Sequence, residues 1–286
     1  MMKTALTGVM SASRDLNVIS NNLANAMTVG FKRSTSQFVD VMGQSQNDQP
    51  GVDIGQGTLQ QVVRRSNSQG SIRQTDNVLD LAMVGPGYFT FGEDPGSSLS
   101  SASGSTITDQ SSLSYSRAGQ LQINPDGQLI DGKSGRPLLG VPPGSTGAIS
   151  ALPQPINIGS ATNGDLTKVK TITIDPKGVV NITKIDGTTT RIAAIAIAKF
   201  NNDDGLKNLG GSSFAETDLS GAVELGRANQ GGYGAVQQGA LEDANVDMTA
   251  EMLHMIQTQQ AYNSNARALQ TGSEMLRASI ETLTRR

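Results

Sequence analysis

The amino-acid sequence predicts an α+β protein whose N- and C-terminal helices pair as a coiled coil, with a mainly β central region. Apolar residues near both chain ends recur at alternating intervals of three and four, which is the spacing of a coiled-coil seam. Between the ends, short β-branched runs are separated by turn signals. We therefore expect a terminal helical domain made of residues 1–48 and 235–286, and β-rich outer domains within residues 49–234.

The N-terminal segment carries a thin apolar seam. Gly8 lies within it and weakens a helix by about 1 kcal/mol relative to Ala, and the Asn-rich end of the segment favours caps and turns. A helix of this kind is marginal alone in water, so it needs a partner. The predicted seam consists of Met2, Ala5, Val9, Ala12, Leu16, Ile19, Leu23 and Ala26.

The C-terminal segment carries a longer seam. Residues 246–284 contain no Pro and a single Gly, Gly272, and Asn245, Asp247 and Thr249 are candidate N-caps. A helix of this length would extend about 55 Å, which favours a coiled coil or an extended packing surface. The predicted seam consists of Met248, Met252, Met255, Gln259, Tyr262, Ala266, Leu269, Ser273, Leu276, Ile280 and Leu283.

The central region reads as β-hairpins. The turn signals are Pro125-Asp-Gly127, Asp175-Pro-Lys-Gly178 and Asp186-Gly187, which supply the residues that tight turns require. β-Branched runs flank them, the longest apolar one being Ile192–Ile197. The step Gly85-Pro-Gly87 lacks the spacing of a dinucleotide fingerprint, so we interpret it as a β-turn that brings the next two aromatic residues into the core.

Composition and motifs argue against an enzyme. The formal net charge is −3 and Cys is absent; with no basic stretch, nucleic acid is not an expected partner. His254 is the single His, next to the seam on a partly solvated face, so the usual zinc constellations are missing. No nucleophile elbow or Walker A motif is present. We expect no catalytic residue, cofactor, metal or small-molecule substrate.

Long motifs near both ends carry a family resemblance. The first is Asn21-Asn-Leu-Ala-Asn-Ala-Met-Thr-Val-Gly-Phe-Lys32, and the second is Gly239-Ala-Leu-Glu-Asp-Ala-Asn-Val-Asp247. In sequence and order they resemble the bacterial flagellar hook and basal-body rod protein family, and Gly85–Phe89 and Tyr115–Gly119 are similar to its central landmarks. Met27 departs from the family pattern. Features of distal-rod and hook members are both present, so the two remain open.

The resemblance implies a structural role. Members stack as a homo-oligomeric helical polymer, a hollow tube whose paired terminal helices line the inside while the β domains face outward. It also implies torque transmission from motor to filament, association with other flagellar axial proteins, and a place in the basal body or hook between periplasm and cell exterior. Export would use the flagellar type III apparatus without a cleaved signal peptide.

The expected subunit-interface residues come from the two seams and the Asn-rich motif. The Asn side chains are poor acid–base groups and poor metal ligands, so we expect them to form a network at the helix terminus. Gly permits a positive φ after that network, and the following Phe anchors the turn. The expected residues are Val9, Leu16, Ile19, Leu23, Asn21, Asn22, Asn25, Gly30, Phe31, Met252, Met255, Tyr262, Leu269, Leu276 and Ile280.

Two other classes of function remain open from the residues alone. One is a secreted β-rich adhesin with a coiled-coil stalk, which would bind a surface ligand and form no tubes. The other is a cell-wall glycan hydrolase, which needs a pair of carboxylates across the scissile bond. Glu216 with Asp218 or Glu224 is the candidate pair.

Overall fold

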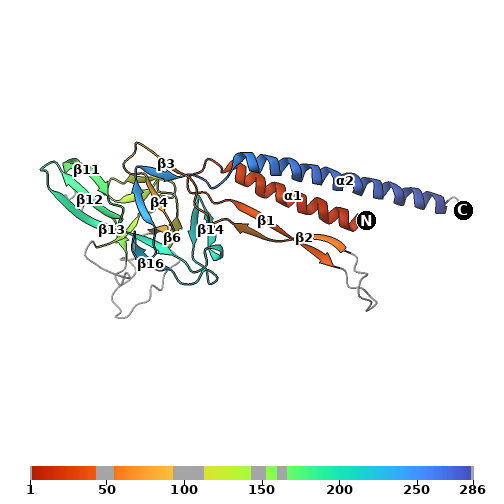
Figure 1. The fold of residues 1–286 in the computed structure, drawn as a ribbon, viewed down its shortest axis with the longest axis horizontal. Helices are drawn as coiled ribbons and strands as arrows, with labels where there is room; N and C mark the ends of the chain where they lie inside the picture. Colours follow the sequence, from red (N-terminus) through yellow and green to blue (C-terminus); the bar gives the residue numbers. More distant parts are fainter. Residues whose placement is uncertain (1, 43–54, 93–112, 143–152, 160–165, 285–286) are drawn as a thin grey trace. The chain divides into compact units, whose positions relative to one another are not determined.

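The structure, a computed structural model, has a helix at each end of the chain and a β-rich region between them (Figure 1). The two helices pack against each other, so the predicted fold class is confirmed. The residues that the structure describes are 2–42, 55–92, 113–142, 153–159 and 166–284.

The chain divides into two compact units. Unit 1 comprises Met1–Ala26, Lys32–Ser66 and Val246–Arg286, and unit 2 comprises Met27–Phe31 and Asn67–Asn245. The domain borders predicted from the sequence lie after residues 48 and 234. In the structure, residues 55–65 pair within unit 1 and residues 235–242 pair within unit 2. Strand pairing therefore places each of these two segments on the other side of its predicted border.

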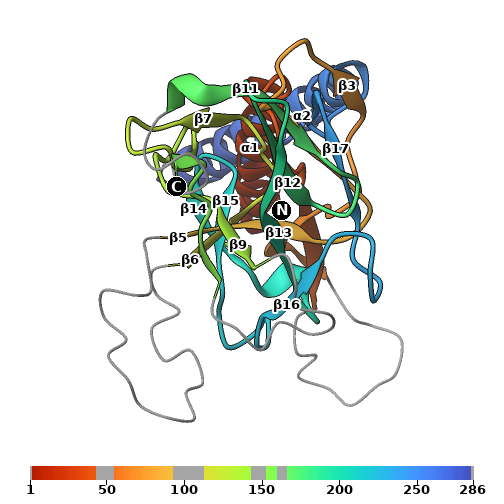
Figure 2. The ribbon, with the colours of Figure 1, turned by 90° about the vertical axis from the view of Figure 1, so that its left-hand side faces the viewer.

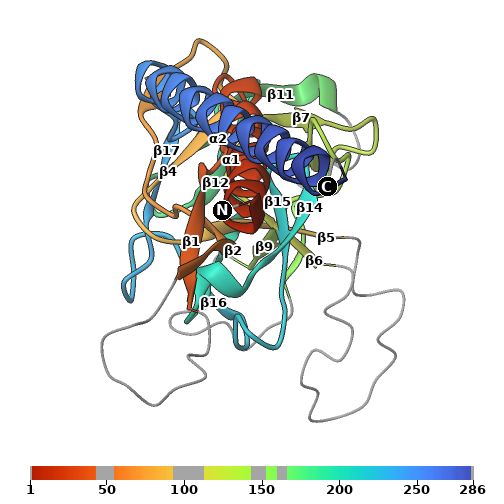
Figure 3. The ribbon, with the colours of Figure 1, turned by 90° about the vertical axis from the view of Figure 1, so that its right-hand side faces the viewer.

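Unit 1 contains the two helices and one β-hairpin. Helix α1 (Met2–Ala24) contacts both helix α2 (Met248–Thr284) and the hairpin (Figure 3). Strand β1 (Ser34–Met42) pairs antiparallel with β2 (Gly55–Arg65). The helices run antiparallel, because Gly8 approaches Asn265 while Met2, near the start of α1, lies level with Gly272 of α2.

The main sheet of unit 2 has 10 strands among the described residues (Figure 2). Its path is β10-β9-β13-β5-β6-β15-β14, and β12 and β16 also pair with β13, the longest strand of this sheet. The members are β5 (Tyr88–Gly92), β6 (Leu113–Ser116), β9 (Leu139–Val141), β10 (Gln154–Pro155), β11 (Val169–Ile174), β12 (Val179–Lys184), β13 (Thr189–Lys199), β14 (Lys207–Gly210), β15 (Ser213–Ala215) and β16 (Glu224–Arg227).

Shorter strands complete unit 2 as antiparallel pairs: β17 with β4, β18 with β3, and β7 with β8. Short 3₁₀ turns precede β11 and β14. The bounds are β3 (Ile72–Gln74), β4 (Leu81–Val84), β7 (Leu121–Ile123), β8 (Leu129–Asp131), η4 (Leu166–Lys168), η5 (Asp203–Gly205), β17 (Ala235–Gln238) and β18 (Ala240–Glu242).

The turns predicted from the sequence are present. Gly127, Gly178 and Gly187 all have a positive φ, the left-handed region that a side chain disfavours. They turn β7 into β8, β11 into β12 and β12 into β13. After the Gly85-Pro-Gly87 step, Tyr88 and Phe89 are buried, as expected. The largest hydrophobic cluster of unit 2 includes Phe89 together with side chains of β4, β12 and β13.

The segment 27–31 is held within unit 2 by backbone contacts. Gly30 has φ +71° and donates its N–H to the carbonyl of Glu242 at 2.8 Å. The Val29 carbonyl accepts from the Lys133 ammonium and the Ser212 hydroxyl, each at 3.2 Å. Burial lowers the pKa of Lys133, and nearby Asp131 opposes the shift. These hydrogen bonds hold residues 27–31, which we call the strap, in a fixed position within unit 2.

A buried carboxylate lies beside this strap. Glu242 is fully buried, and its two oxygens accept from the Gly70 N–H at 3.0 Å and from the Arg117 guanidinium at 3.2 Å. Arg117 also lies 5.2 Å from the centre of the Tyr88 ring. The side chain of Glu242 and its carbonyl therefore join four segments that are distant in the sequence.

Gly30→Ala should destabilise the protein strongly. A Cβ at Gly30 would lie 2.7 Å from the backbone nitrogen of Ala118, so overpacking adds about 1–3 kcal/mol to the left-handed backbone cost of about 1–2 kcal/mol. Gly187→Ala is the matched control, since Gly187 has φ +79° and open space around it. Urea unfolding of both variants measures the difference. Equal losses in the free energy of unfolding would mean that the backbone near residue 30 shifts at little cost to make room for the Cβ.

Glu242→Ala should cost about 3–5 kcal/mol, because it leaves the Arg117 guanidinium buried without its carboxylate. Asp243→Ala is the control: its partner Arg73, at 3.3 Å, has a side chain 56% exposed, and exposed pairs contribute up to about 1 kcal/mol. The measurement is the free energy of unfolding from urea titrations. A Glu242 variant as stable as the Asp243 variant would show that the buried pair does not hold unit 2 together.

Candidate functional site

The candidate site is the surface of unit 1. The packing of the inner face of α1 determines which side chains remain on that surface. The buried residues of α1 are Ala5, Ala12, Asp15, Ile19 and Asn22. Three of these belong to the predicted seam. The other two replace the predicted inward positions Leu16 and Leu23, which are half-buried, as is Val9. The buried face of α1 is therefore rotated slightly about the helix axis from the predicted seam. As a result, two polar side chains that have hydrogen-bond partners point inward.

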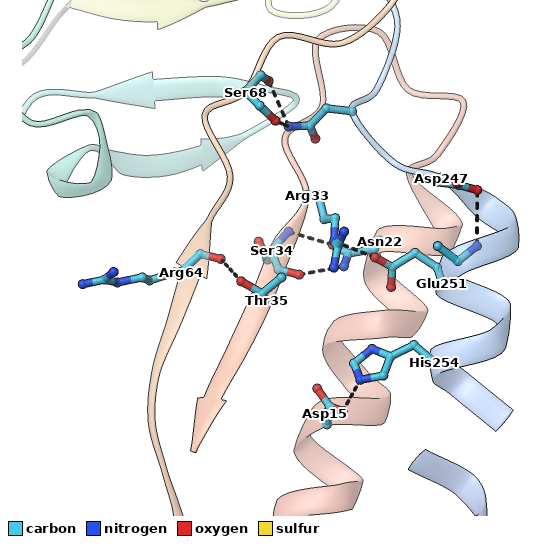
Figure 4. Close-up of polar contacts among 12 residues, drawn as sticks. Asp15, Asn22, Arg33, Ser34, Thr35, Arg64, Ser68, Asp247, Glu251 and His254 are labelled. Atoms are coloured by element: carbon cyan, nitrogen blue, oxygen red, sulfur yellow. Dashed lines mark hydrogen bonds and ion pairs between the residues drawn. The ribbon is translucent and has the colours of Figure 1, made fainter. Parts of the chain in front are cut away.

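The first inward polar group is Asp15. Its Oδ2 accepts from the Thr258 hydroxyl at 3.1 Å and lies 3.5 Å from Nε2 of His254 (Figure 4). Thr258 also bonds to the carbonyl of His254 at 2.9 Å. As expected, His254 is partly solvated, since its side chain is 47% exposed. A buried polar contact of this kind is best known for fixing the register of paired helices.

The Asn cluster forms the helix-terminus network that the sequence analysis expected. The Asn22 side chain donates to the Ser34 carbonyl at 2.7 Å and accepts from the Ser34 N–H at 2.9 Å, which fixes the first residue of β1 against the end of α1 (Figure 4). The Asn25 amide donates to the Asn21 carbonyl at 2.9 Å. The cluster therefore controls how the chain leaves α1 and enters the hairpin.

The start of α2 is capped and paired. Asp247 Oδ1 accepts from the backbone N–H groups of Thr249 and Ala250 at 2.9 and 3.2 Å, which is an N-cap. The Arg33 guanidinium lies 2.7 Å from Glu251 Oε1 (Figure 4). Since Glu251 is buried in the first turn, the helix dipole also favours its charge. These contacts join the hairpin, α1 and α2 into one unit.

The remaining predicted interface residues have different surroundings. On α2, Met255 and Leu269 are half-buried, whereas Met252, Tyr262, Leu276 and Ile280 are exposed. Two predicted residues, Gly30 and Phe31, belong to unit 2; Gly30 is buried, and the Phe31 carbonyl accepts the N–H of Asn245. The side chain of Leu283 lies outside the described residues.

Helix α2 is longer than its partner. An added Cβ at Gly272 would meet Met2 at 3.1 Å, so Gly272 is level with the first described residue of α1. Residues 273–284 of α2 continue beyond the end of α1, as Figure 1 shows. At the rise of an α-helix, these twelve residues extend about 18 Å. We call this segment the overhang. The heptad face that packs on α1 continues along it through Leu276 and Ile280.

Large apolar side chains are exposed elsewhere in unit 1. They include Leu6 and Met10 on α1, and Met252, Leu253 and Ile256 on α2. The hairpin exposes Phe38, Val39, Leu59, Val62 and Val63. Extended apolar surface of this kind marks an interaction site. The hairpin was not predicted from the sequence, although the Phe38–Val41 run and the Val62–Val63 pair were signals for it.

A groove of about 550 Å³ runs between the helices and the hairpin. Small and polar side chains form most of its lining, with Phe38 as one apolar wall. Within the described part of the chain, no three potential ligands gather as a metal site requires, and neither helix is long and apolar enough to span a membrane. The groove is lined by Thr4, Gly8, Ser11, Ala12, Asp15, Phe38, Gly57, Thr58, His254, Gln257, Thr258, Ala261 and Asn265.

Two family descriptions match the parts of the chain that contain the terminal helices. "Flagella basal body rod protein" matches residues 2–32, and "Flagellar basal body rod FlgEFG protein C-terminal" matches residues 237–282. A solved structure, the flagellar hook protein FlgE2 of Helicobacter pylori, is 16% identical with a TM-score of 0.23, covering 46% of this chain and 38% of that one.

Full-length relatives are also similar. The flagellar basal-body rod protein FlgG of Agrobacterium fabrum is 32% identical, covering 95% of this chain and 94% of the relative. The protein of the same name from Caulobacter vibrioides is 31% identical over 98% of each chain, and that from Bacillus subtilis is 30% identical over 96% and 95%. The chain therefore belongs to the flagellar basal-body rod protein family.

Proposed function

We propose that this chain is a distal-rod subunit that polymerises through its terminal helices into a hollow helical tube and transmits torque from the motor to the filament. Its family membership makes it a structural subunit of the flagellar rod or hook, which assembles with other axial proteins in the basal body. The relatives reported above, which span nearly the whole chain, bear the name rod protein, and this supports the distal rod over the hook.

The observation that carries the polymer proposal is the unpartnered apolar face of α2. Leu276 and Ile280 follow the inner face of the helix past the end of α1, yet they are 50% and 62% exposed. Burial of each would contribute roughly 1.5–3 kcal/mol, so another copy that covers them gains stability. The expected interface roles of Met252 and Tyr262 rest on the same exposure.

The proposed role is structural and needs no catalysis, cofactor or metal. Family membership supports this, because the family consists of structural rod proteins. The alternatives of a secreted adhesin and a cell-wall glycan hydrolase have no support in the comparisons. Burial raises the pKa of Glu216, but a glycosidase needs a matched pair of carboxylates on either side of a bound sugar.

We also propose that the chain reaches the basal body, from the periplasm outward, through the flagellar type III apparatus without cleavage of a signal peptide. The expected result is retention of the full-length chain inside cells that lack the export ATPase. Immunoblots of cell and culture fractions measure it. Release of the chain from such cells at the parental level would contradict this route.

Leu276→Ala should weaken polymerisation without destabilising the isolated subunit. The side chain is half exposed in one copy, so its loss leaves thermal unfolding of the monomer nearly unchanged. If the polymer buries it fully, the critical concentration should rise about 10- to 100-fold. Sedimentation, electron microscopy of tubes and spreading in soft agar measure assembly and motility.

The matched control is Met275→Ala, the neighbouring apolar residue, which points about 100° away from Leu276 around the helix and is 66% exposed. This variant loses a similar apolar side chain and should polymerise almost normally. A Leu276 variant that assembles and swims like the Met275 variant would remove the proposed role of the α2 seam. Straight tubes would support a rod subunit, and curved tubes a hook subunit.

A further inference from the structure

The overhang and the groove of unit 1 are complementary in length. The overhang comprises residues 273–284, about 18 Å of helix. The groove follows α1 from Thr4 to Asp15 and α2 from His254 to Asn265, which is about 17 Å along each helix. The groove therefore matches most of the length of the overhang.

The lining of the groove suits a helix. Ala12 and Ala261 have small side chains, which allow the backbone of an incoming helix to approach closely, whereas Gly8 already approaches Asn265 of its own copy. Knobs-into-holes packing places one apolar side chain among four residues of the facing surface, and the overhang offers Leu276 and Ile280 for this purpose. Both belong to the face that already packs on α1 over residues 251–272, so the contact would extend an existing helix–helix interface.

A copy cannot fill its own groove with its own overhang. The groove is walled by residues 254–265 of α2 and the overhang is the rigid continuation of the same helix, so the two surfaces stay apart within one chain. The occupant must come from another molecule. The overhang carries Glu274, Arg277 and Glu281, and of these Arg277 has the sign opposite to that of Asp15, which lies in the groove.

We propose that the overhang of one copy docks in the groove of a second copy, with Leu276 and Ile280 turned toward α1 of that copy. The inference rests on the proposed polymerisation and specifies which surfaces meet. It is a head-to-tail contact between two different surfaces, so each copy gives one overhang and receives one. Contacts of this type produce rings or open helical filaments, and the second outcome is the one that a tube requires.

Disulfide cross-linking tests the contact directly, because the natural chain contains no cysteine. Polymers of the Ser11→Cys variant, whose thiol would lie in the groove, are grown with a minor fraction of Leu276→Cys copies and oxidised with copper phenanthroline. Two thiols then lose their protons and two electrons to the oxidant and form one S–S bond, which requires Cα atoms within about 7 Å. A second series uses Ala261→Cys in place of Ser11→Cys.

We expect a covalent dimer in at least one series, with a yield that rises with the Leu276→Cys fraction. Copies of Met275→Cys, added in the same way, are the control for a side chain that points about 100° away from Leu276, and they should give at least tenfold less dimer. A double variant with Ser11→Cys and Leu276→Cys should give a ladder of multimers, because each copy then carries both partners.

The outcomes separate this inference from the proposed function. Polymers that form normally but give no Leu276-dependent dimer in either series overturn the overhang–groove contact and leave polymerisation intact. Equal dimer yields from Met275→Cys and Leu276→Cys also overturn it. Cross-links between two Leu276→Cys copies in place of the groove dimer would show pairing of overhangs. Failure of the parent chain to form any polymer overturns the proposed function itself.

Discussion

The antiparallel pairing of α1 with α2 is the constraint on which the rest of unit 1 depends. Neither helix has a complete apolar surface of its own, and α1 contributes mainly small or polar side chains, with Ile19 as its large buried residue. Close approach at Gly8 and Asn265 and the contact of Asp15 with Thr258 fix where one helix lies along the other. That register determines which part of α2 is covered and which part protrudes.

The same pairing explains why polar residues occupy the inside of unit 1. A buried carboxylate or amide destabilises a fold unless it is hydrogen-bonded, and Asp15, Asn22 and Glu251 all have partners within this unit. A seam of Leu alone would allow the helices to slide by a heptad, whereas these contacts are satisfied at one register. Unit 2 uses the same device at Glu242, where one carboxylate joins segments from distant parts of the chain.

Much of the fold could be predicted because its signals are local. The turns at Gly127, Gly178 and Gly187 and the N-cap at Asp247 follow from neighbouring residues. The orientation of α1 could not, since the stripe through Leu16 and Leu23 and the stripe through Asp15 and Asn22 share their remaining positions, and Thr258 is far away in the sequence. The hairpin was missed because register shifts at Gln37/Phe38 and Asp40/Met42 interrupt its alternation. The period of the sequence predicted which residues of α2 share one face, and their role in an interface stays a prediction. The overhang could not be predicted, because it depends on the register between the two helices.

Because the two helices differ in length, a polymer built through the proposed contact of overhang and groove would have a direction. The overhang and the groove are two different surfaces, and the contact proposed here joins one overhang to one groove. A twofold axis would instead bring the same surface of two copies together, so the contact alone has a head-to-tail direction. A stack built by inserting one into the other ends in unoccupied grooves on one side and bare apolar helix tips on the other. These two ends differ in chemistry, and they would add and lose subunits at different rates. In such a polymer, a difference in growth between the two ends would originate in the twelve described residues of α2 that extend past Gly272, which lies level with Met2.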